Sequence, residues 1–96
     1  MKRRDALSVG EIIAEFMERE HLDDVLAEHR ALALWPAIVG EGIDRYTTSR
    51  AVDNGIITVA ISSAPLRHQL MLSRATIVEQ MNNAVGRQVI RDIRIR

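Results

Sequence analysis

The residues of this chain best suited to chemistry are its arginines, which dominate the second half of the sequence. Residues 45–96 contain eight arginines and three acidic residues, whereas residues 1–44 contain five basic and ten acidic residues, so the formal charges are +5 and −5. A guanidinium group presents a planar fork of donors that fits phosphate and carboxylate groups. Such asymmetry favours contact with nucleic acid. The alternative is a solvated surface whose two halves attract each other.

Seven of these arginines are the candidate nucleic-acid-binding residues. They occur in predicted strands and in one predicted helix, and they are Arg45, Arg50, Arg67, Arg74, Arg91, Arg94 and Arg96. If folding brings them onto a single cationic surface, that surface can neutralise several phosphates, which makes affinity steeply salt-dependent. Two structural alternatives remain: the arginine stems cover apolar sheet edges, or charges on edge strands deter aggregation.

A mixed basic and apolar stripe provides a second candidate surface. Arg67, Met71, Arg74 and Val78 follow helical spacing beside the predicted core stripe of their helix. Met71 and Val78 are therefore candidate partner-binding residues. Tyr46 is the only ring that we expect to be exposed, so base stacking of the kind used by RRM domains is not expected.

The remaining candidates for catalysis or metal binding do not converge. His21, His29 and His68 have no partner histidine three or four residues away, and the chain has no cysteine to complete a metal site. Ser62 and Ser63 stand at a strand-to-helix junction without the G-x-S-x-G of a nucleophile elbow, and helix capping explains them better. No glycine-rich phosphate loop is present. We predict a protein that is not an enzyme, with no cofactor, metal or small-molecule substrate.

Length and composition predict one small domain over residues 1–96, because a chain of 96 residues has a single core. Apolar residues make up 47% of it and aromatic residues 3%, which favours an aliphatic core. No apolar run is long enough to span a membrane, and the basic N-terminus lacks the apolar stretch of a signal peptide. We therefore expect a cytoplasmic protein without membrane contact. Residues 1–7 are expected to form a flexible basic arm.

Two helices and a turn are predicted in the first half of the chain. Ser8 and Glu11 form a capping box before an amphipathic helix over Val9–Arg19. A second helix extends to about Leu34. Its expected core residues are Leu22, Val25, Leu26 and Leu32. Trp35 and Pro36 begin a short further turn that Gly40 ends.

The second half predicts a hairpin, a long helix and a last strand. Residues 43–52 favour a strand, the Asn-Gly pair of Asp53-Asn54-Gly55 favours a tight turn, and residues 56–61 form the return strand. A single long helix, capped by Ser62 or Ser63, then extends to Gly86. Its core stripe is Leu66, Leu70, Ile77, Met81 and Ala84 or Val85. A strand over residues 88–95 should point Val89, Ile93 and Ile95 inward.

These elements predict an α+β fold with the order α-α-β-β-α-β. The helices should pack on one face of a three-stranded mixed sheet, giving two layers. We assign structural roles to Trp35 as a core anchor, and to Gly40, Gly55 and Gly86 as turn and helix-end residues.

With these landmarks, the chain resembles the DciA family. The segment Leu34-Trp35-Pro36-Ala37-Ile38-Val39-Gly40 is similar to the family's W-x-x-I/V-V-G core, and Tyr46-Thr47 stands where the family has His-Thr. The hairpin Asp53–Val59 matches D-G-x-L-x-V, and a leucine-containing helix opening follows it over Leu66–Leu72. Residues 86–96 match a closing G-x-x-x-I-x-x-I-R-I/F-R pattern. The resemblance covers the chain from about Val9 to its end.

The resemblance implies a KH-like domain that binds single-stranded or forked DNA and helps to load or activate the replicative helicase. Members of the family often carry a flexible C-terminal extension, whereas the predicted last strand runs to the end of this sequence, so helicase contact is expected to differ if the extension mediates it. The acidic first half offers a complementary face for a protein partner through Glu11, Glu15, Glu18, Asp23, Asp24 and Glu28. Two alternatives stay open, a protein–protein adaptor without nucleic-acid binding and an RNA-binding module.

Overall fold

The computed structural model describes residues 22–96. A helix over residues 22–33 leads into α2 (Trp35–Val39), α3 (Glu41–Asp44), β1 (Thr47–Asp53), β2 (Ile56–Ile61), α4 (Ala64–Leu72), α5 (Arg74–Val85) and β3 (Asp92–Ile95). The predicted helix over Val9–Arg19, its capping box and the basic arm of residues 1–7 lie outside the described residues. Among those that are described, the α+β class and the order of the elements are confirmed.

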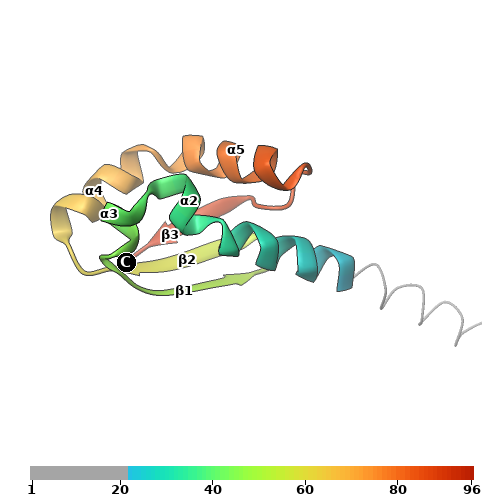
Figure 1. The fold of residues 1–96 in the computed structure, drawn as a ribbon, viewed down its shortest axis with the longest axis horizontal. Helices are drawn as coiled ribbons and strands as arrows, with labels where there is room; N and C mark the ends of the chain where they lie inside the picture. Colours follow the sequence, from blue (N-terminus) through green and yellow to red (C-terminus); the bar gives the residue numbers. More distant parts are fainter. Residues whose placement is uncertain (1–21) are drawn as a thin grey trace, which may run out of the picture.

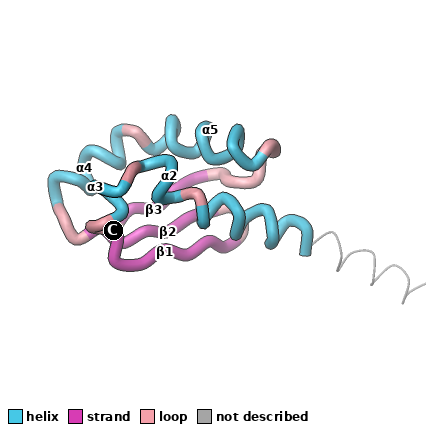
Figure 2. The backbone as a smooth tube through the Cα atoms, viewed as in Figure 1, coloured by secondary structure: helices cyan, strands magenta, loops and turns pink. Residues whose placement is uncertain are grey.

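The strands form one mixed sheet in the order β1-β2-β3, as expected. β1 and β2 pair antiparallel, and β2 and β3 pair parallel across the connection made by α4 and α5. In Figure 1, α4 and α5 lie above the strands, and Figure 2 shows the same separation of helices from sheet. Along β2 the side chains alternate between buried and half-buried positions, so one face of the sheet carries the helices.

Within residues 22–96 the core is aliphatic apart from one tryptophan. Trp35, Ile57, Val59, Met81 and Ile93 are its largest fully enclosed side chains. The buried cluster is completed by Ala31, Ile61, Leu70, Ile77 and Ile90. It therefore lies between the inner face of the sheet and the helices. It contains the predicted inward positions of the central strand, together with Leu70, Ile77 and Met81 of the predicted helix stripe, and Leu66 packs against it.

The Asn54-Gly55 turn is a type I′ hairpin turn, because both residues have positive φ angles, of 52° and 80°. Gly55 is also closely approached by its neighbours. A Cβ atom there would lie 3.0 Å from Nε of Arg91 and 3.2 Å from the carbonyl oxygen of Val89. The sequence therefore identified the turn, while the close approach of the segment before β3 gives a second reason for glycine.

The prediction of one long helix after the hairpin is wrong, because the helix breaks at Ser73. Its N-cap is confirmed: the Oγ atom of Ser63 accepts from the amide of Leu66 at 3.4 Å. Ser73 has φ −100° and ψ 8°, and its amide donates to the carbonyl oxygens of Gln69 and Leu70. The bond to Leu70 spans three residues, as in a 3₁₀-helix, and it tightens the last turn of α4. α5 then begins in a new direction (Figure 1). Ala84 is exposed and Val85 packs against the core.

The first strand starts later than predicted. Ile43 and Asp44 belong to α3, and β1 begins at Thr47. Gly40, with a φ of 92°, ends α2 as expected, but its carbonyl oxygen then accepts from the amide of Asp44 in a further helical turn. Residues 43 and 44 therefore adopt a helical turn in spite of the strand propensity of this segment, because the turn places Ile43 beside the core.

The buried face of the helix over residues 22–33 is not the predicted one. Leu22 and Leu26 are 54% and 51% exposed, whereas Ala27 and Ala31 are completely buried. Val25 and Leu32 are half-buried. Alanine permits close approach of the helix to the rest of the domain, so that the small residues rather than the large ones face inward.

The last strand is shorter than predicted, since β3 spans only Asp92–Ile95. Ile90 is 3% exposed and Ile93 is fully buried, although they are three positions apart and strand alternation would put them on opposite faces, so the alternation does not extend back to residue 88. The side chain of Asn82 takes the place of a strand partner. Its Oδ1 atom accepts from the amides of Val89 and Ile90 at 2.9 and 2.8 Å, and its Nδ2 donates to the carbonyl oxygen of Ile90 at 2.9 Å.

Gly86 ends α5 in the left-handed conformation, with a φ of 90°. Substituting alanine there should lower the free energy of unfolding by about 1–2 kcal/mol, since a Cβ atom is strained at this φ. Urea denaturation followed by circular dichroism measures the change. Gly42→Ala is the matched control: Gly42 lies in α3 without a positive φ and with open space around it, so the change should be neutral or slightly stabilising. Equal losses in both variants would contradict the explanation.

Candidate functional site

The seven candidate arginines are distributed over two ends and one face of the sheet. β2 leads from the hairpin turn at Gly55 to its other end at Ile61, roughly 20 Å away. β3 is parallel to β2, so its start lies near the hairpin turn and its end near Ile61. In Figure 1 the C-terminus marks this second end, beside α3. Position along β2 therefore decides which arginines are neighbours.

Backbone hydrogen bonds bring Arg45, Arg67 and Arg96 to the Ile61 end. The amide of Ile61 donates to the carbonyl oxygen of Arg96 at 2.8 Å, and Nη1 of Arg67 donates to the carbonyl oxygen of Ile61 at 2.6 Å. The amide of Ser62 donates to the carbonyl oxygen of Tyr46 at 2.9 Å, which places the preceding Arg45 at the same end. Segments far apart in the sequence thus converge there.

Arg94 continues this surface on the face of the sheet opposite the helices. It pairs with Thr58 of β2, which in turn pairs with Ala51 of β1. Ile93 and Ile95 point toward the core, so Arg94 points away from it and is exposed. We call Arg45, Arg67, Arg94 and Arg96 the basic surface. None of the ion pairs within residues 22–96 involves any of these four.

The other three candidate arginines are engaged elsewhere. Nη1 of Arg50 lies 3.9 Å from Oδ1 of Asp44, and Nε of Arg74 lies 3.2 Å from Oδ1 of Asp92. Arg91 donates through Nη2 and Nε to the carbonyl oxygen of Asn54, at 2.7 and 3.2 Å. The seven side chains therefore do not form the single surface that the sequence predicted, because register and local contacts separate them.

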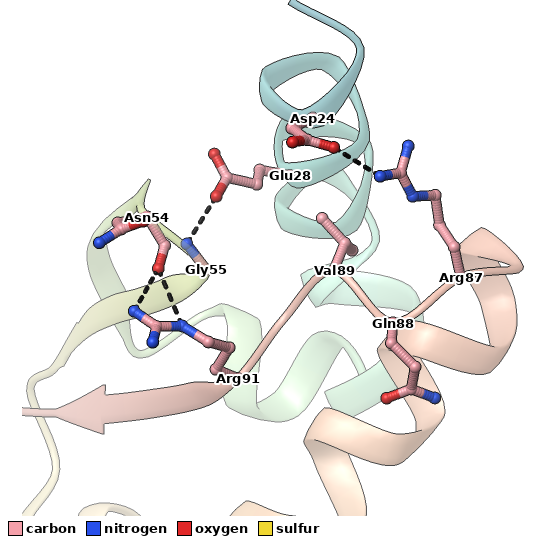
Figure 3. A pocket seen from close by; sticks show the side chains of 8 residues that line it. All are labelled: Asp24, Glu28, Asn54, Gly55, Arg87, Gln88, Val89 and Arg91. Atoms are coloured by element: carbon pink, nitrogen blue, oxygen red, sulfur yellow. Dashed lines mark hydrogen bonds and ion pairs between the residues drawn. The ribbon is translucent and has the colours of Figure 1, made fainter. Parts of the chain in front are cut away.

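The hairpin end carries a mixed-charge hollow instead of a basic patch (Figure 3). Arg87, which was not among the candidates, forms an ion pair with Asp24 at 2.5 Å. The lining of this cavity of about 220 Å³ comes from the helix over residues 22–33, the hairpin turn and the segment before β3; it consists of Asp24, Glu28, Asn54, Gly55, Arg87, Gln88, Val89 and Arg91. Two of the predicted partner-facing carboxylates, Asp24 and Glu28, are therefore turned toward the domain itself.

The two candidate partner-binding residues differ in their surroundings. Met71 is 53% exposed near the end of α4, and the following Leu72 is 77% exposed. Val78 is half-buried and packs against the core from α5. The break at Ser73 interrupts the stripe between Met71 and Arg74. An exposed apolar corner at Met71 and Leu72 therefore replaces the continuous stripe that helical spacing predicted.

The tryptophan and threonine of the sequence motifs form one hydrogen-bonded unit. Nε1 of Trp35 donates to Oγ1 of Thr47 at 3.0 Å, and Oγ1 of Thr47 donates to the carbonyl oxygen of Ile43 at 3.1 Å. Trp35 is fully buried and belongs to the core cluster. Asn82, by contrast, was missed: its position on a helix gave no signal that it faces inward, and only its contacts reveal its role.

Potential catalytic groups lie apart within the described residues. His29 and His68 are exposed on different helices, and Ser63 caps α4. Residues 22–96 contain no group of three histidine, cysteine or acidic side chains placed to hold a metal ion. In the same part of the chain no helix combines the length and the apolar character needed to cross a membrane.

The chain is similar to known proteins over nearly its whole length. A UPF0232 protein of Mycobacterium tuberculosis is 27% identical over 92 residues, which cover 96% of this chain and 49% of the mycobacterial protein. UPF0232 proteins of Mycobacterium ulcerans and Mycobacterium leprae are 24% identical over the same length and the same shares. The chain thus spans about half the length of the curated relatives it matches. A family model described as the DnaC and DnaI antecedent, DciA, matches residues 8–95, and the chain therefore belongs to the DciA family.

Proposed function

We propose that this chain is a non-enzymatic accessory protein of DNA replication that binds single-stranded or forked DNA and assists the replicative helicase. Membership of a family named as the antecedent of DnaC and DnaI supports the connection with replication. The observation that carries the nucleic-acid part is the basic surface, where Arg45, Arg67 and Arg96 converge at one end of the sheet and Arg94 extends the charge along its open face.

The basic surface fits a phosphate backbone better than base edges. Arginine forks bind phosphate through paired donors, and each phosphate neutralised releases counterions. Among residues 22–96 the one exposed aromatic ring is Tyr46, which is 46% exposed, so this part of the chain offers a single stacking position. A binder of this kind follows the backbone with little sequence preference. Cytoplasmic location is part of this proposal, since the ligand is replicating DNA.

Contacts within the domain separate the seven arginines by the contribution that each is expected to make to phosphate binding. Arg50 and Arg74 lie beside Asp44 and Asp92, which compete with phosphate for their guanidinium groups. Arg91 is held by the hairpin turn at the far end of the sheet. We therefore expect the basic surface to supply most of the phosphate contacts, with Arg50, Arg74 and Arg91 contributing less.

A protein adaptor is the second candidate function, and the exposed corner at Met71 and Leu72 is the observation that favours it. Large apolar side chains that are more than half exposed on adjacent positions are suited to a protein partner. On α4, Met71 lies one turn beyond Arg67 of the basic surface, so the two functions would use adjoining surfaces. The helicase is the proposed partner on the ground of the family alone.

The test compares two double variants that remove equal charge. Arg94→Gln with Arg96→Gln should lower the slope of log affinity against log salt by about 1.4, because each lost contact to a single strand is worth about 0.7. Arg74→Gln with Arg87→Gln changes two arginines that are paired with Asp92 and Asp24, and should leave the slope within about 0.7 of the parent. Fluorescence anisotropy of labelled single-stranded DNA, forked DNA and RNA at several salt concentrations measures the slopes.

The same preparations separate the proposed functions. Retention on immobilised replicative helicase should persist in the Arg94/Arg96 double variant and weaken in Met71→Ser with Leu72→Ser. Absence of oligonucleotide binding by the parent protein would overturn the nucleic-acid proposal and leave the adaptor. Equal slopes for the two double variants would show that net charge, rather than the basic surface, determines binding. Tighter binding of RNA than of DNA would reassign the ligand.

A further inference from the structure

We infer that Asn54 is a latent deamidation site that the folded domain protects through Glu28 and Arg91. Asparagine followed by glycine is the dipeptide most prone to this reaction, because glycine places no side chain in the path of the attacking nitrogen. Asn54 is exposed on the hairpin turn. The chemistry requires only water and the chain itself.

The reaction proceeds through a cyclic imide. The amide nitrogen of Gly55 loses its proton to a solvent base and attacks the side-chain Cγ of Asn54, forming an N–Cγ bond. The Cγ–Nδ2 bond then breaks and ammonia leaves with a proton from solvent. Water adds to one of the two imide carbonyl carbons, and the bond from that carbon to the imide nitrogen breaks, giving aspartate if Cγ is attacked and isoaspartate if the main-chain carbon is attacked. The net change consumes one water and releases one ammonia, without oxidation or reduction.

The structure holds both ends of the peptide unit that must move. The amide of Gly55 donates to Oε2 of Glu28 at 2.5 Å, and the carbonyl oxygen of Asn54 accepts from Nη2 and Nε of Arg91. In Figure 3, Glu28 lies above the turn and Arg91 below it. The attacking nitrogen is therefore engaged as a donor to a carboxylate, which disfavours loss of its proton.

A further contact fixes the next peptide unit, so that Gly55 is held on both sides. The amide of Arg91 donates to the carbonyl oxygen of Gly55 at 2.7 Å, and Gly55 is buried. Asn54 has a φ of 52° and Gly55 a φ of 80°, as the two-residue turn demands. Ring closure needs the Gly55 nitrogen to swing toward Cγ of Asn54, which would break these bonds together. Reaction is thus expected when the helix over residues 22–33 separates from the hairpin.

Formation of isoaspartate would be irreversible for the hairpin. It routes the main chain through the former side chain and adds one carbon to a turn that has room for two residues. The register of β1 and β2 is fixed by that turn, so the added atom displaces the carbonyl group that Arg91 holds. Modification would therefore keep the helix over residues 22–33 from docking again in the same way.

The test measures isoaspartate at Asn54 by peptide mapping with mass spectrometry during incubation at mildly alkaline pH. The native parent protein should react at least about tenfold more slowly than the same chain in denaturant, since a hydrogen bond to a charged group can shift an equilibrium by that factor. Glu28→Ala should react several-fold faster than the native parent, and Glu28→Gln, which retains an acceptor oxygen, should fall between them.

Asp24→Ala is the matched control, because Asp24 lies one turn away on the same helix and binds Arg87 rather than the hairpin. It should react at the parent rate. Amide hydrogen exchange shows whether Glu28→Ala opens the turn alone: the Gly55 amide should lose protection while that of Val59 keeps it. If Val59 also loses protection in Glu28→Ala, Arg91→Lys replaces it as the test variant. It should then form isoaspartate faster than the parent while the Val59 amide keeps its protection. A parent rate equal to that of the denatured chain, or equal rates in Glu28→Ala and Asp24→Ala, would overturn the inference.

Discussion

Replacing Asn82 by leucine is expected to lower the free energy of unfolding by about 3 kcal/mol or more. The side chain is 3% exposed and has the shape of leucine without its apolar character. It binds the amides of Val89 and Ile90 and the carbonyl oxygen of Ile90 at 2.8–2.9 Å. Leucine would leave these three groups without partners, and each buried orphan costs about 1–3 kcal/mol.

The loss is large against the stability of a domain of this size, about 5–15 kcal/mol. Urea denaturation followed by Trp35 fluorescence and by circular dichroism measures it. Asn83→Leu is the control, because Asn83 is the exposed neighbour on the same helix and its replacement should change stability by about 0.5 kcal/mol at most. Similar losses for both substitutions would mean that leucine disturbs α5 itself, and that the bonds to the segment before β3 matter little.

Replacing Trp35 by alanine is expected to cost about 3–5 kcal/mol, the range for deleting a large aromatic side chain from a core. Trp35 is fully buried and packs in the cluster that joins α2 to the sheet. Its indole N–H is satisfied by Thr47, so the substitution removes both the packing and the link from α2 to β1. Circular dichroism during urea denaturation measures the change, since the fluorescent probe is lost.

A double-mutant cycle isolates the hydrogen bond from the packing. Thr47→Val keeps the shape of the side chain and leaves the indole N–H of Trp35 unpaired, so it should cost about 1–3 kcal/mol. In a Trp35→Phe background the same substitution should cost less, with a coupling of about 0.5–3 kcal/mol. Additive losses would show that the two residues act independently, against the 3.0 Å contact between Nε1 and Oγ1.

The contacts of Trp35 and Asn82 show that the motif residues beside them stabilise the fold, and we do not expect them to contact a ligand. The tryptophan motif and the threonine that follows it lie in one hydrogen-bonded unit that seats α2 and α3 against β1. The closing segment from Gly86 is held by Asn82. The proposed DNA binding is therefore expected to depend on exposed arginines outside these contacts. Variants of Trp35 or Asn82 should then change DNA affinity only through the stability of the domain.

The opposite charges of the two halves of the chain are arranged differently at the two ends of the sheet. At the hairpin end the two halves meet, because Asp24 pairs with Arg87 from the other half of the sequence. At the Ile61 end Arg67 and Arg96 form no ion pair within residues 22–96. Mutual attraction of the two halves is therefore seen at the hairpin end, whereas the cationic surface at the Ile61 end belongs to the proposed function. Exposed pairs such as Arg87 with Asp24 add little stability in water, so their main effect is on which arginines stay available.

The sequence by itself determined the elements whose signals are local. The Asn54-Gly55 turn, the Ser63 cap, the end of α5 at Gly86 and the alternation along β2 each depend on neighbouring residues, and all were confirmed. Predictions from local sequence patterns were wrong where packing against a distant segment determined the structure. The break at Ser73 and the burial of Ala27 in place of Leu26 depend on how helices fit the sheet, which no window of the sequence contains.

Only the tertiary structure decided which arginines share a surface. Arg91 and Arg96 are five residues apart, yet one binds the hairpin turn and the other pairs with Ile61 at the far end of β2. Arg45 and Arg96 are far apart in the chain and lie at the same end of the sheet. Proximity of this kind is set by strand order and register, which follow from burial of the apolar face of the sheet. The arginines lie outside that face, so the sequence around each of them does not indicate which other arginines are near it in the fold.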